Sequence, residues 1–152
     1  LGKLDITYDI LTKTPELKAA IELVRACPDT RFVLDHISKP YISRQELEPW
    51  KSLITELATF ENVSCKISGL VTEANWKDWE VSDFTPYTDH IIESFSTSRI
   101  MFGSDWPVAL LAADSYSQVV GLAEKVTAGF SASEKEAFWA LNVARSYKIT
   151  NL

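Results

Sequence analysis

The sequence predicts an α/β fold in which parallel β-strands alternate with helices. Two observations support this class: four short apolar runs each end in polar residues, and the segments between them place apolar residues at helical spacing. Strands separated by helices are joined by crossover connections, which are right-handed in nearly all proteins and leave the strands parallel. Because no internal repeat or linker divides the chain, we expect one domain over residues 1–152.

The first two strands are expected within residues 4–10 and 31–36. In the first, apolar residues alternate with Asp and Thr, as in a strand with one buried face. The second is an apolar run that ends at Asp35 and His36, shortly before Pro40. His36 is one of two histidines in the chain, and for this run alone a core histidine is the more common interpretation.

The other two strands are expected within residues 62–70 and 99–105. In the first of them, polar residues occupy alternate positions before a glycine: Ser64, Lys66 and Ser68. The second leads through two small residues to Asp105, and Pro107 ends the ladder. The period of two places Asp105 at the carboxyl end of its strand. This run alone supports equally a functional acid and an aspartate that caps the following turn.

Helices are expected between these strands and after the last one. Their expected ranges are 14–27, 50–58, 87–95, 115–127 and 131–147. Thr14 is an N-cap before a proline at the first helical position, and Pro28 ends this helix. The third helix is expected to start after Pro86, and the last begins at the capping-box patterns that follow Ser131. Parallel strands joined in this way gather functional groups beyond their carboxyl ends.

The composition is that of a globular chain and argues against several classes of partner. Hydrophobic residues make up 46% of the chain, and the net charge is -6 at pH 7. An acidic chain is poorly suited to nucleic acid or to an anionic membrane surface. No apolar run approaches the roughly 20 residues of a membrane helix, and no signal-peptide pattern opens the chain, so we expect a cytoplasmic location. Cys27 and Cys65 fit reduced, buried thiols and match no metal motif.

Four short motifs stand out in the sequence: residues 35–40 (DHISKP), 65–70 (CKISGL), 102–107 (FGSDWP) and 142–147 (NVARSY). Together they resemble motifs of the amidohydrolase-related (amidohydrolase 2) hydrolases, in a lactonase branch similar to L-fuconolactonase and L-rhamnono-lactonase. In that family the Gly-Ser-Asp strand is the eighth of a TIM (β/α)8 barrel, so the resemblance implies that this chain forms strands five to eight with outer helices. A complete barrel typically needs about 250 residues, and the chain matches its C-terminal half.

The resemblance implies hydrolysis of a sugar-acid lactone, which is a cyclic ester and a small-molecule substrate. Asp105 is then the general base that removes a proton from the attacking water. His36 is the expected donor to the oxyanion, or a metal ligand together with Asp105. We expect one divalent metal ion, such as zinc, or none, because Tyr8 and Asp9 stand where many related sites carry a strand-five histidine.

Four further residues are candidates for substrate binding: Lys39, Lys66, Trp76 and Trp106. A lysine can hold the carboxylate or the hydroxyls of a sugar acid, but Lys66 could equally pair with Asp9 or Asp35. Tryptophan rings offer flat apolar faces to a sugar, although large aromatic residues more often serve as packing surface. Trp106 is the stronger of the two candidates because it adjoins Asp105.

The His-x-His pair of the family's first strand does not occur in these residues, so we expect a domain that is incomplete at its N-terminus and inactive as an isolated piece. The edges of strands five and eight are then unpaired, inward side chains are exposed, and homo-oligomers can form through these edges. Two other classes stay open. One is an inactive half-barrel that serves as an interaction or regulatory module. The other is an open doubly wound sheet that binds a small ligand, although no Gly-x-Gly-x-x-Gly loop occurs.

Overall fold

Four parallel strands of the described chain form a sheet whose spatial order follows the sequence. The structure is a computed structural model that describes residues 1–150. The strands are β1 (Tyr8–Ile10), β2 (Phe32–Leu34), β3 (Val63–Ile67) and β4 (Ile100–Phe102), in the order β1-β2-β3-β4. A doubly wound sheet has a point at which its strand order reverses, and these four strands show no reversal. The order therefore favours the barrel arrangement over the doubly wound sheet.

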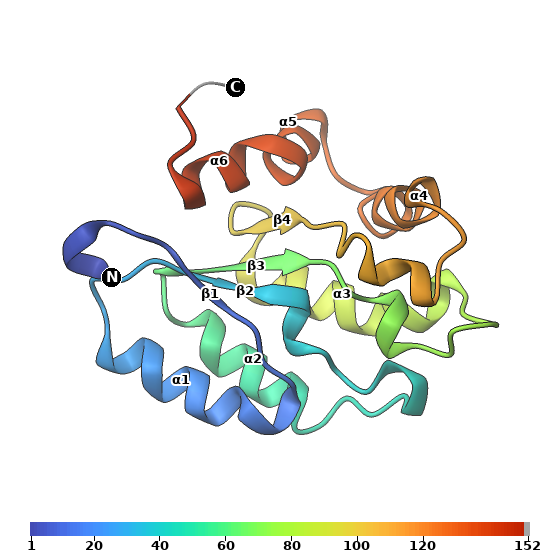
Figure 1. Ribbon diagram of the computed structural model, residues 1–152, viewed down its shortest axis with the longest axis horizontal. Coiled ribbons are helices and arrows are strands. Elements are labelled where there is room, and N and C mark those ends of the chain that lie inside the picture. Colours follow the sequence, from blue (N-terminus) through green and yellow to red (C-terminus); the bar gives the residue numbers. More distant parts are fainter. Residues whose placement is uncertain (151–152) are drawn as a thin grey trace.

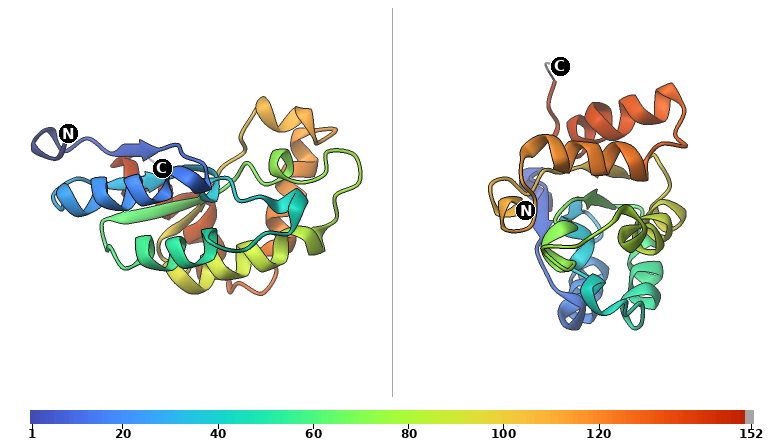
Figure 2. Two further views of the ribbon diagram at one scale, coloured as in Figure 1. Left: turned by 90° about the horizontal axis from the view of Figure 1, so that it is seen from below. Right: turned by 90° about the vertical axis from the view of Figure 1, so that its right-hand side faces the viewer.

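The helices form an arc around one side of this sheet. They are α1 (Leu17–Ala26), α2 (Trp50–Ala58), α3 (Val81–Phe95), α4 (Tyr116–Val126), α5 (Ala132–Glu136) and α6 (Asn142–Tyr147). The crossover helices α1, α2 and α3 lie on the same face of the sheet (Figure 1). The end-on view shows α4 to α6 continuing the arc past β4 (Figure 2, right). This arrangement, with strands inside and helices outside, is that of part of a barrel.

The hydrophobic core fills the space between the sheet and the crossover helices. The side chains of Leu17, Ile54 and Phe84, one from each of these helices, have no exposed surface. Trp50 is also buried, and its ring packs edge-on against those of Tyr87 and His90. Burial of a large apolar side chain stabilises the fold by about 1.5–3 kcal/mol. The amphipathic spacing of these helices is therefore what fixes them to the sheet.

Several elements differ from the sequence prediction. The helix expected over 131–147 is divided into α5, a π-helical segment (Ala137–Leu141) and α6. Helix α3 begins at Val81 and contains Pro86, whereas the prediction started the helix after this proline. Pro86 lies in the second turn and lacks the N–H that would donate to the carbonyl of Ser82, so it costs the helix one hydrogen bond. The helix start is capped separately, because the Glu80 backbone N–H donates to the Asp83 carboxylate (2.9 Å). The expected strand over 4–10 is shorter than predicted, because residues Gly2–Leu4 form a 3-10 turn and pairing starts only at Tyr8.

The inner face of the sheet is covered in part, so the expectation of exposed inward side chains holds for Asp9, which is 42% exposed, and is wrong for Val33 and Met101. Val33 and Met101 point away from the crossover helices, yet neither has exposed surface. At the end of α6, the Tyr147 hydroxyl is hydrogen-bonded to the carboxylate of Asp9. Its ring centroid lies 5.2 Å from Nζ of Lys66, within cation–π range. The last turn of the C-terminal helix thus shields part of the face that points toward a barrel interior.

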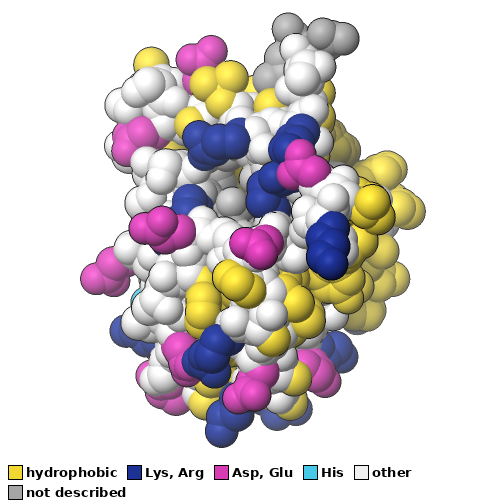
Figure 3. Space-filling view, turned by 90° about the vertical axis from the view of Figure 1, so that its left-hand side faces the viewer, with side chains coloured by type: hydrophobic (Ala, Val, Ile, Leu, Met, Phe, Trp, Pro, Cys, Tyr) yellow, Lys and Arg dark blue, Asp and Glu magenta, His cyan; other side chains and the backbone are white. Residues whose placement is uncertain are grey.

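Strands β1 and β4 are the two edges of the sheet, and the segment around β1 carries an apolar surface. We call this surface the β1 patch; its residues are Leu1, Leu4, Ile6, Tyr8 and Leu11, each at least 41% exposed. The face of the molecule at the left of Figure 1 shows hydrophobic side chains gathered along one flank (Figure 3).

None of the helices in residues 1–150 has the length and apolar character that crossing a bilayer requires.

Candidate active site

The segments that follow β2 and β4, two strands separated by β3, bring His36 and Asp105 together. His36 lies in a tight turn directly after β2, and Asp105 lies three residues after β4. Nε2 of His36 is 3.5 Å from Oδ1 of Asp105. The two side chains are 16% and 9% exposed. Residues separated by 69 positions in the sequence therefore meet beyond the carboxyl ends of their strands, where parallel sheets place their functional groups.

The backbone that carries His36 is strained. The residues from His36 to Lys39 all have positive φ angles, between 46° and 58°, and Asp105 has a φ of 53°. This region is rare for side chains other than glycine, and Ile37 is β-branched, which makes it still less favourable there. The indole N–H of Trp50 donates to the carbonyl oxygen of Ile37 at 2.7 Å and helps to hold this turn. Strain of this kind gathers at functional sites.

The imidazole of His36 is held from two sides. Its Nδ1 is 2.8 Å from Oγ of Ser68, within hydrogen-bond distance. Gly69 passes under the ring so closely that a Cβ there would lie 2.8 Å from Cγ of His36, and its φ of 62° also favours glycine. Burial lowers the pKa of His36, and the nearby Asp105 opposes this effect only in part. The ring is thus fixed in orientation and shifted toward its neutral form.

The carboxylate of Asp105 has unused hydrogen-bonding capacity. Its Oδ2 is buried and finds no hydrogen-bond partner among the described residues. Its Oδ1 is 3.5 Å from the His36 Nε2, which is longer than an ordinary N–H···O bond of about 2.7–3.2 Å. A buried carboxylate oxygen without a partner costs free energy, so the site favours a group that can donate to it or coordinate it.

A second charged cluster lies on the inner face of the sheet. Nζ of Lys66 is 2.7 Å from Oδ1 of Asp35 and 3.5 Å from Oδ1 of Asp9. Burial by itself would lower the pKa of Lys66, but hydrogen bonds with Asp35 and Tyr147 outweigh burial and raise it. Lys66 therefore pairs with both Asp9 and Asp35, the two partners that the sequence left open. A role of Lys66 in substrate binding stays a prediction.

Within residues 1–150, the remaining candidates form no hydrogen bond or ion pair with the His36–Asp105 pair. Nζ of Lys39 is 3.1 Å from the carboxylate of Glu73. The Trp76 ring is 51% exposed, and its N–H donates to a backbone carbonyl of its own loop. The Trp106 ring is 49% exposed. The described residues show no hydrogen bond or ion pair from either tryptophan side chain to the pair, and their contact with a substrate stays a prediction.

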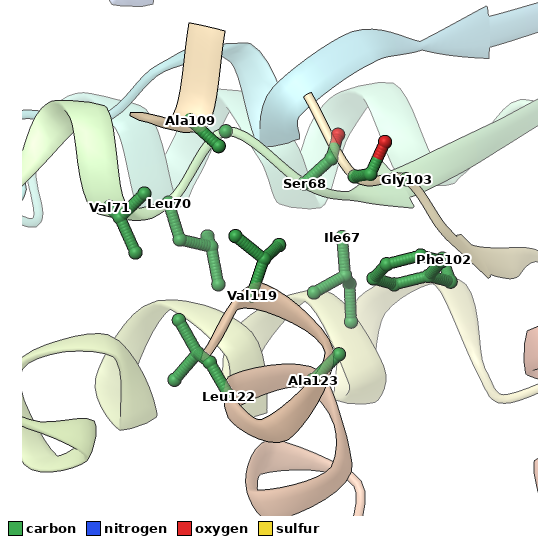
Figure 4. Close-up of a pocket in the computed structure, with 12 residues that line it drawn as sticks. Ile67, Ser68, Leu70, Val71, Phe102, Gly103, Ala109, Val119, Leu122 and Ala123 are labelled. Carbon is green, nitrogen blue, oxygen red and sulfur yellow. The ribbon is translucent and has the colours of Figure 1, made fainter. Parts of the chain in front are cut away.

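Sequence reasoning did not assign roles to Ser68, Gly69 and Trp50. Ser68 ends the polar row of β3, and Gly69 follows it, so the alternation and the glycine were the available signals. Neither signal shows that Ser68 and Gly69 contact His36. Ser68 and Gly103 lie side by side at one edge of an apolar pocket that α4 closes with Val119 (Figure 4). The contact with Trp50 depends on the packing of α2 and has no local signature.

The site can be tested against a divalent metal ion by its donors. An imidazole nitrogen and a carboxylate are both ligands that zinc accepts. Nε2 of His36 faces the carboxylate of Asp105, whose Oδ2 lacks a partner, so these two residues fit as a pair of ligands. Within residues 1–150 no group of three or more His, Cys, Asp or Glu side chains is arranged to hold a metal ion.

The chain is similar in sequence to known hydrolases. The profile of the family described as amidohydrolase matches residues 1–149. An L-fucono-1,5-lactonase of Burkholderia multivorans is 36% identical over 156 aligned residues, which cover 95% of this chain and 52% of that protein. An L-fucono-1,5-lactonase of Burkholderia ambifaria is 39% identical over 108 residues, or 71% of this chain and 37% of that protein. The resemblance noted in the sequence is thereby confirmed.

The chain also resembles solved amidohydrolase structures in its fold. A crystal structure of an amidohydrolase from Burkholderia multivorans with bound zinc superposes with a TM-score of 0.88 and 37% sequence identity, over 97% of this chain and 54% of that one. The chain thus spans about half the length of the first curated relative and of this solved structure. The predicted fold class is confirmed: four parallel strands with outer helices form half of an amidohydrolase barrel.

Proposed function

The chain belongs to the amidohydrolase family, and we propose that it forms the strand-five to strand-eight half of a sugar-acid lactonase. The observation that carries this proposal is the His36–Asp105 pair, in which a strained backbone presents an imidazole to a buried carboxylate with an unpartnered oxygen. The two L-fucono-1,5-lactonase relatives support a six-membered sugar-acid lactone as the substrate class.

Asp105 is the proposed general base. A water molecule attacks the carbonyl carbon of the lactone, and a carboxylate oxygen of Asp105 accepts the proton that the water loses. The bond between the carbonyl carbon and the ring oxygen then breaks, and the proton passes to that oxygen as it leaves. The product is the open hydroxy acid, so one lactone and one water are consumed and Asp105 returns to its starting state.

His36 is the proposed partner of Asp105 in binding and orientation. The bound zinc of the Burkholderia multivorans structure supports one divalent ion in this family, and His36 and Asp105 are the residues of this chain that would hold it. A bound divalent ion would lower the pKa of a coordinated water. A metal-bound histidine usually makes a hydrogen bond through its other ring nitrogen, and this bond orients the ring. The contact of His36 with Ser68 is of this kind.

The proposal is tested in a chimera, because the chain matches about half of each relative. The residues that precede the matched region in the Burkholderia multivorans L-fucono-1,5-lactonase are fused to residues 1–152. The chimera is expected to hydrolyse L-fucono-1,5-lactone, measured as acid release, and the isolated 152-residue chain is expected to be inactive. Asp105→Asn in the chimera should lower kcat/KM by about 10²-fold or more, because the amide keeps the shape but cannot accept the proton.

The matched control is Asp114→Asn, which removes an exposed carboxylate from the same segment and should leave turnover unchanged. Circular dichroism establishes that each chimera is folded. A folded chimera whose turnover survives Asp105→Asn assigns the base to another residue. A folded chimera without lactone hydrolysis contradicts the proposed function and favours the alternative, an inactive half-barrel that serves as an interaction module.

A further inference from the structure

Ser68 presents a hydroxyl to the one ring nitrogen of His36 that points away from Asp105. The distance from Oγ of Ser68 to Nδ1 of His36 is 2.8 Å. Ser68 is 4% exposed, so this hydroxyl has little access to water. A neutral imidazole carries its single proton on either Nδ1 or Nε2, and a hydrogen bond at one nitrogen selects the form of the other. Ser68 is therefore placed to decide whether Nε2 faces Asp105 with a lone pair or with an N–H.

The surroundings leave the hydroxyl of Ser68 few alternatives. Among the described residues, His36 is its one side-chain or backbone hydrogen-bond partner. Behind Ser68 the pocket is lined mainly by apolar side chains, among them Ile67, Phe102 and Leu122 (Figure 4). A hydroxyl at an apolar wall must use the partner in front of it or remain unsatisfied at a cost.

Gly103 provides the space that this contact needs. A Cβ at position 103 would lie 2.8 Å from Cβ of Ser68 and 3.0 Å from its Oγ. Any larger residue at position 103 would therefore push Ser68 from its place. Gly69 has the same relation to the ring itself, since a Cβ there would lie 2.9 Å from Nδ1 of His36. Two glycines thus shape a fitted space around one imidazole and one hydroxyl.

The opposite side of the ring indicates the direction of the hydrogen bond. Nε2 of His36 is 3.5 Å from Oδ1 of Asp105, and no hydrogen bond joins them. A proton on Nε2 would thus lack a good acceptor in Asp105, whereas a proton on Nδ1 has one at 2.8 Å. We propose that Ser68 is a positioning residue that accepts a hydrogen bond from Nδ1–H of His36. The Nε2 lone pair then stays free on the side of Asp105, where a divalent ion or a proton donor would bind it and the carboxylate together.

The tautomer is measured by ¹⁵N NMR of the two histidines in the intact 152-residue chain, at a pH well above the ordinary imidazole pKa. Wild-type His36 is expected to carry its proton on Nδ1. Ser68→Ala should shift the ratio of the two tautomers toward Nε2–H by about tenfold, which is the size of one neutral hydrogen bond. His90, a residue of α3 whose ring packs against Trp50 of α2, is the internal reference. This measurement needs no catalysis, so it can fail independently of the proposed function.

Two further variants complete the test. Ser64→Ala is the matched control, because it removes a hydroxyl from the same face of β3 and should leave the His36 signals unchanged. Gly103→Ala keeps the hydroxyl of Ser68 but displaces it, and should shift the tautomer in the same direction as Ser68→Ala. A wild-type proton on Nε2, or a ratio unaffected by Ser68→Ala in a folded chain, overturns the proposal.

The catalytic consequence rests on the proposed lactonase function and is measured in the chimera. There Ser68→Ala should lower kcat severalfold with a much smaller change in KM, while the midpoint of thermal unfolding stays near that of Ser64→Ala. A serine with a merely structural role would instead lower the unfolding midpoint and leave kcat unchanged. That second pattern contradicts the positioning role even if the chimera hydrolyses lactones.

Discussion

At the scale of single residues, the segment from His36 to Lys39 has a backbone conformation that few side chains adopt. Each such residue costs roughly 1–2 kcal/mol relative to an ordinary conformation. The surrounding contacts offset this cost: Ile37 is 1% exposed, and Oγ of Ser38 is 2.8 Å from Oγ1 of Thr12. The strain fixes the direction in which His36 leaves the sheet. It belongs to the site and does not reflect loose packing.

Tyr147 provides a prediction about alkaline pH. Burial and the hydrogen bond to Asp9 raise the pKa of Tyr147 to about 12. The folded state therefore holds this proton more tightly than the unfolded state, whose ordinary value is about 10. The stabilisation is complete below pH 10 and is lost as the pH rises toward 12. The difference in unfolding free energy between wild type and Tyr147→Phe should shrink over this window.

Urea unfolding at a series of alkaline pH values measures this difference. Tyr116→Phe, which removes a hydroxyl from an exposed ring, is the matched control. If the difference between wild type and Tyr147→Phe is constant from pH 9 to 12, the contact of Tyr147 with Asp9 does not hold the proton in solution.

At the scale of elements, helix α2 supports the candidate site from a distance. Its first residue, Trp50, packs in the core and donates through its indole to Ile37, which follows His36 directly. The helix thereby joins the crossover layer to the strained turn. The position of His36 depends on both β2 and α2, although the two elements are separated by 15 residues of turns and coil.

Trp50→Phe tests this coupling. The variant removes the hydrogen bond to the Ile37 carbonyl and part of a buried ring, and should lower the free energy of unfolding by about 1–3 kcal/mol. Trp79→Phe is the matched control, because the Trp79 indole also donates to a backbone carbonyl, at 2.6 Å from Ala112. Both variants should lose stability, but only Trp50→Phe should shift the imidazole resonances of His36 in NMR spectra. Unchanged His36 signals in Trp50→Phe would show that the turn keeps its conformation without the hydrogen bond from Trp50.

At the scale of the whole molecule, the two ends of the described chain are joined. Oγ1 of Thr7 donates to the carbonyl oxygen of Ser146 at 2.6 Å, and Lys148 forms an ion pair with Asp5. These contacts bring the last helix to the segment before β1 and help to cover part of the inner face. They leave the β1 patch and the outer edge of β1 open.

We expect the 152-residue chain to self-associate through the β1 edge. An unpaired strand edge next to exposed apolar side chains favours pairing with another chain. Leu4 and Leu11 are 71% and 63% exposed, and Leu4→Lys combined with Leu11→Lys should reduce association. Light scattering at several protein concentrations gives the mass. Leu141→Lys, at a 45% exposed leucine of the C-terminal segment, is the control, and a wild-type chain that is monomeric throughout would rule the association out.

The sequence by itself determined the order of strands and helices and the placement of His36 and Asp105 at strand ends. These features follow from local signals, because the periods of two and 3.6 and the prolines act on neighbouring residues. Helix α2 has the predicted bounds, and α4 differs by one residue at each end. The strand ends were less well determined, since pairing depends on the neighbouring strand.

Only the tertiary structure decided how the site residues contact one another. The hydrogen bond between Ser68 and His36 joins residues 32 positions apart. Lys66, on β3, lies closer to Asp35, at the end of the neighbouring β2, than to Asp9. The left-handed turn at His36 has no signature in residues 36–39, because side chains of this kind disfavour it and Trp50 holds it from another helix. Local propensity cannot contain this information, because the free energy that fixes such contacts comes from packing between elements distant in the chain.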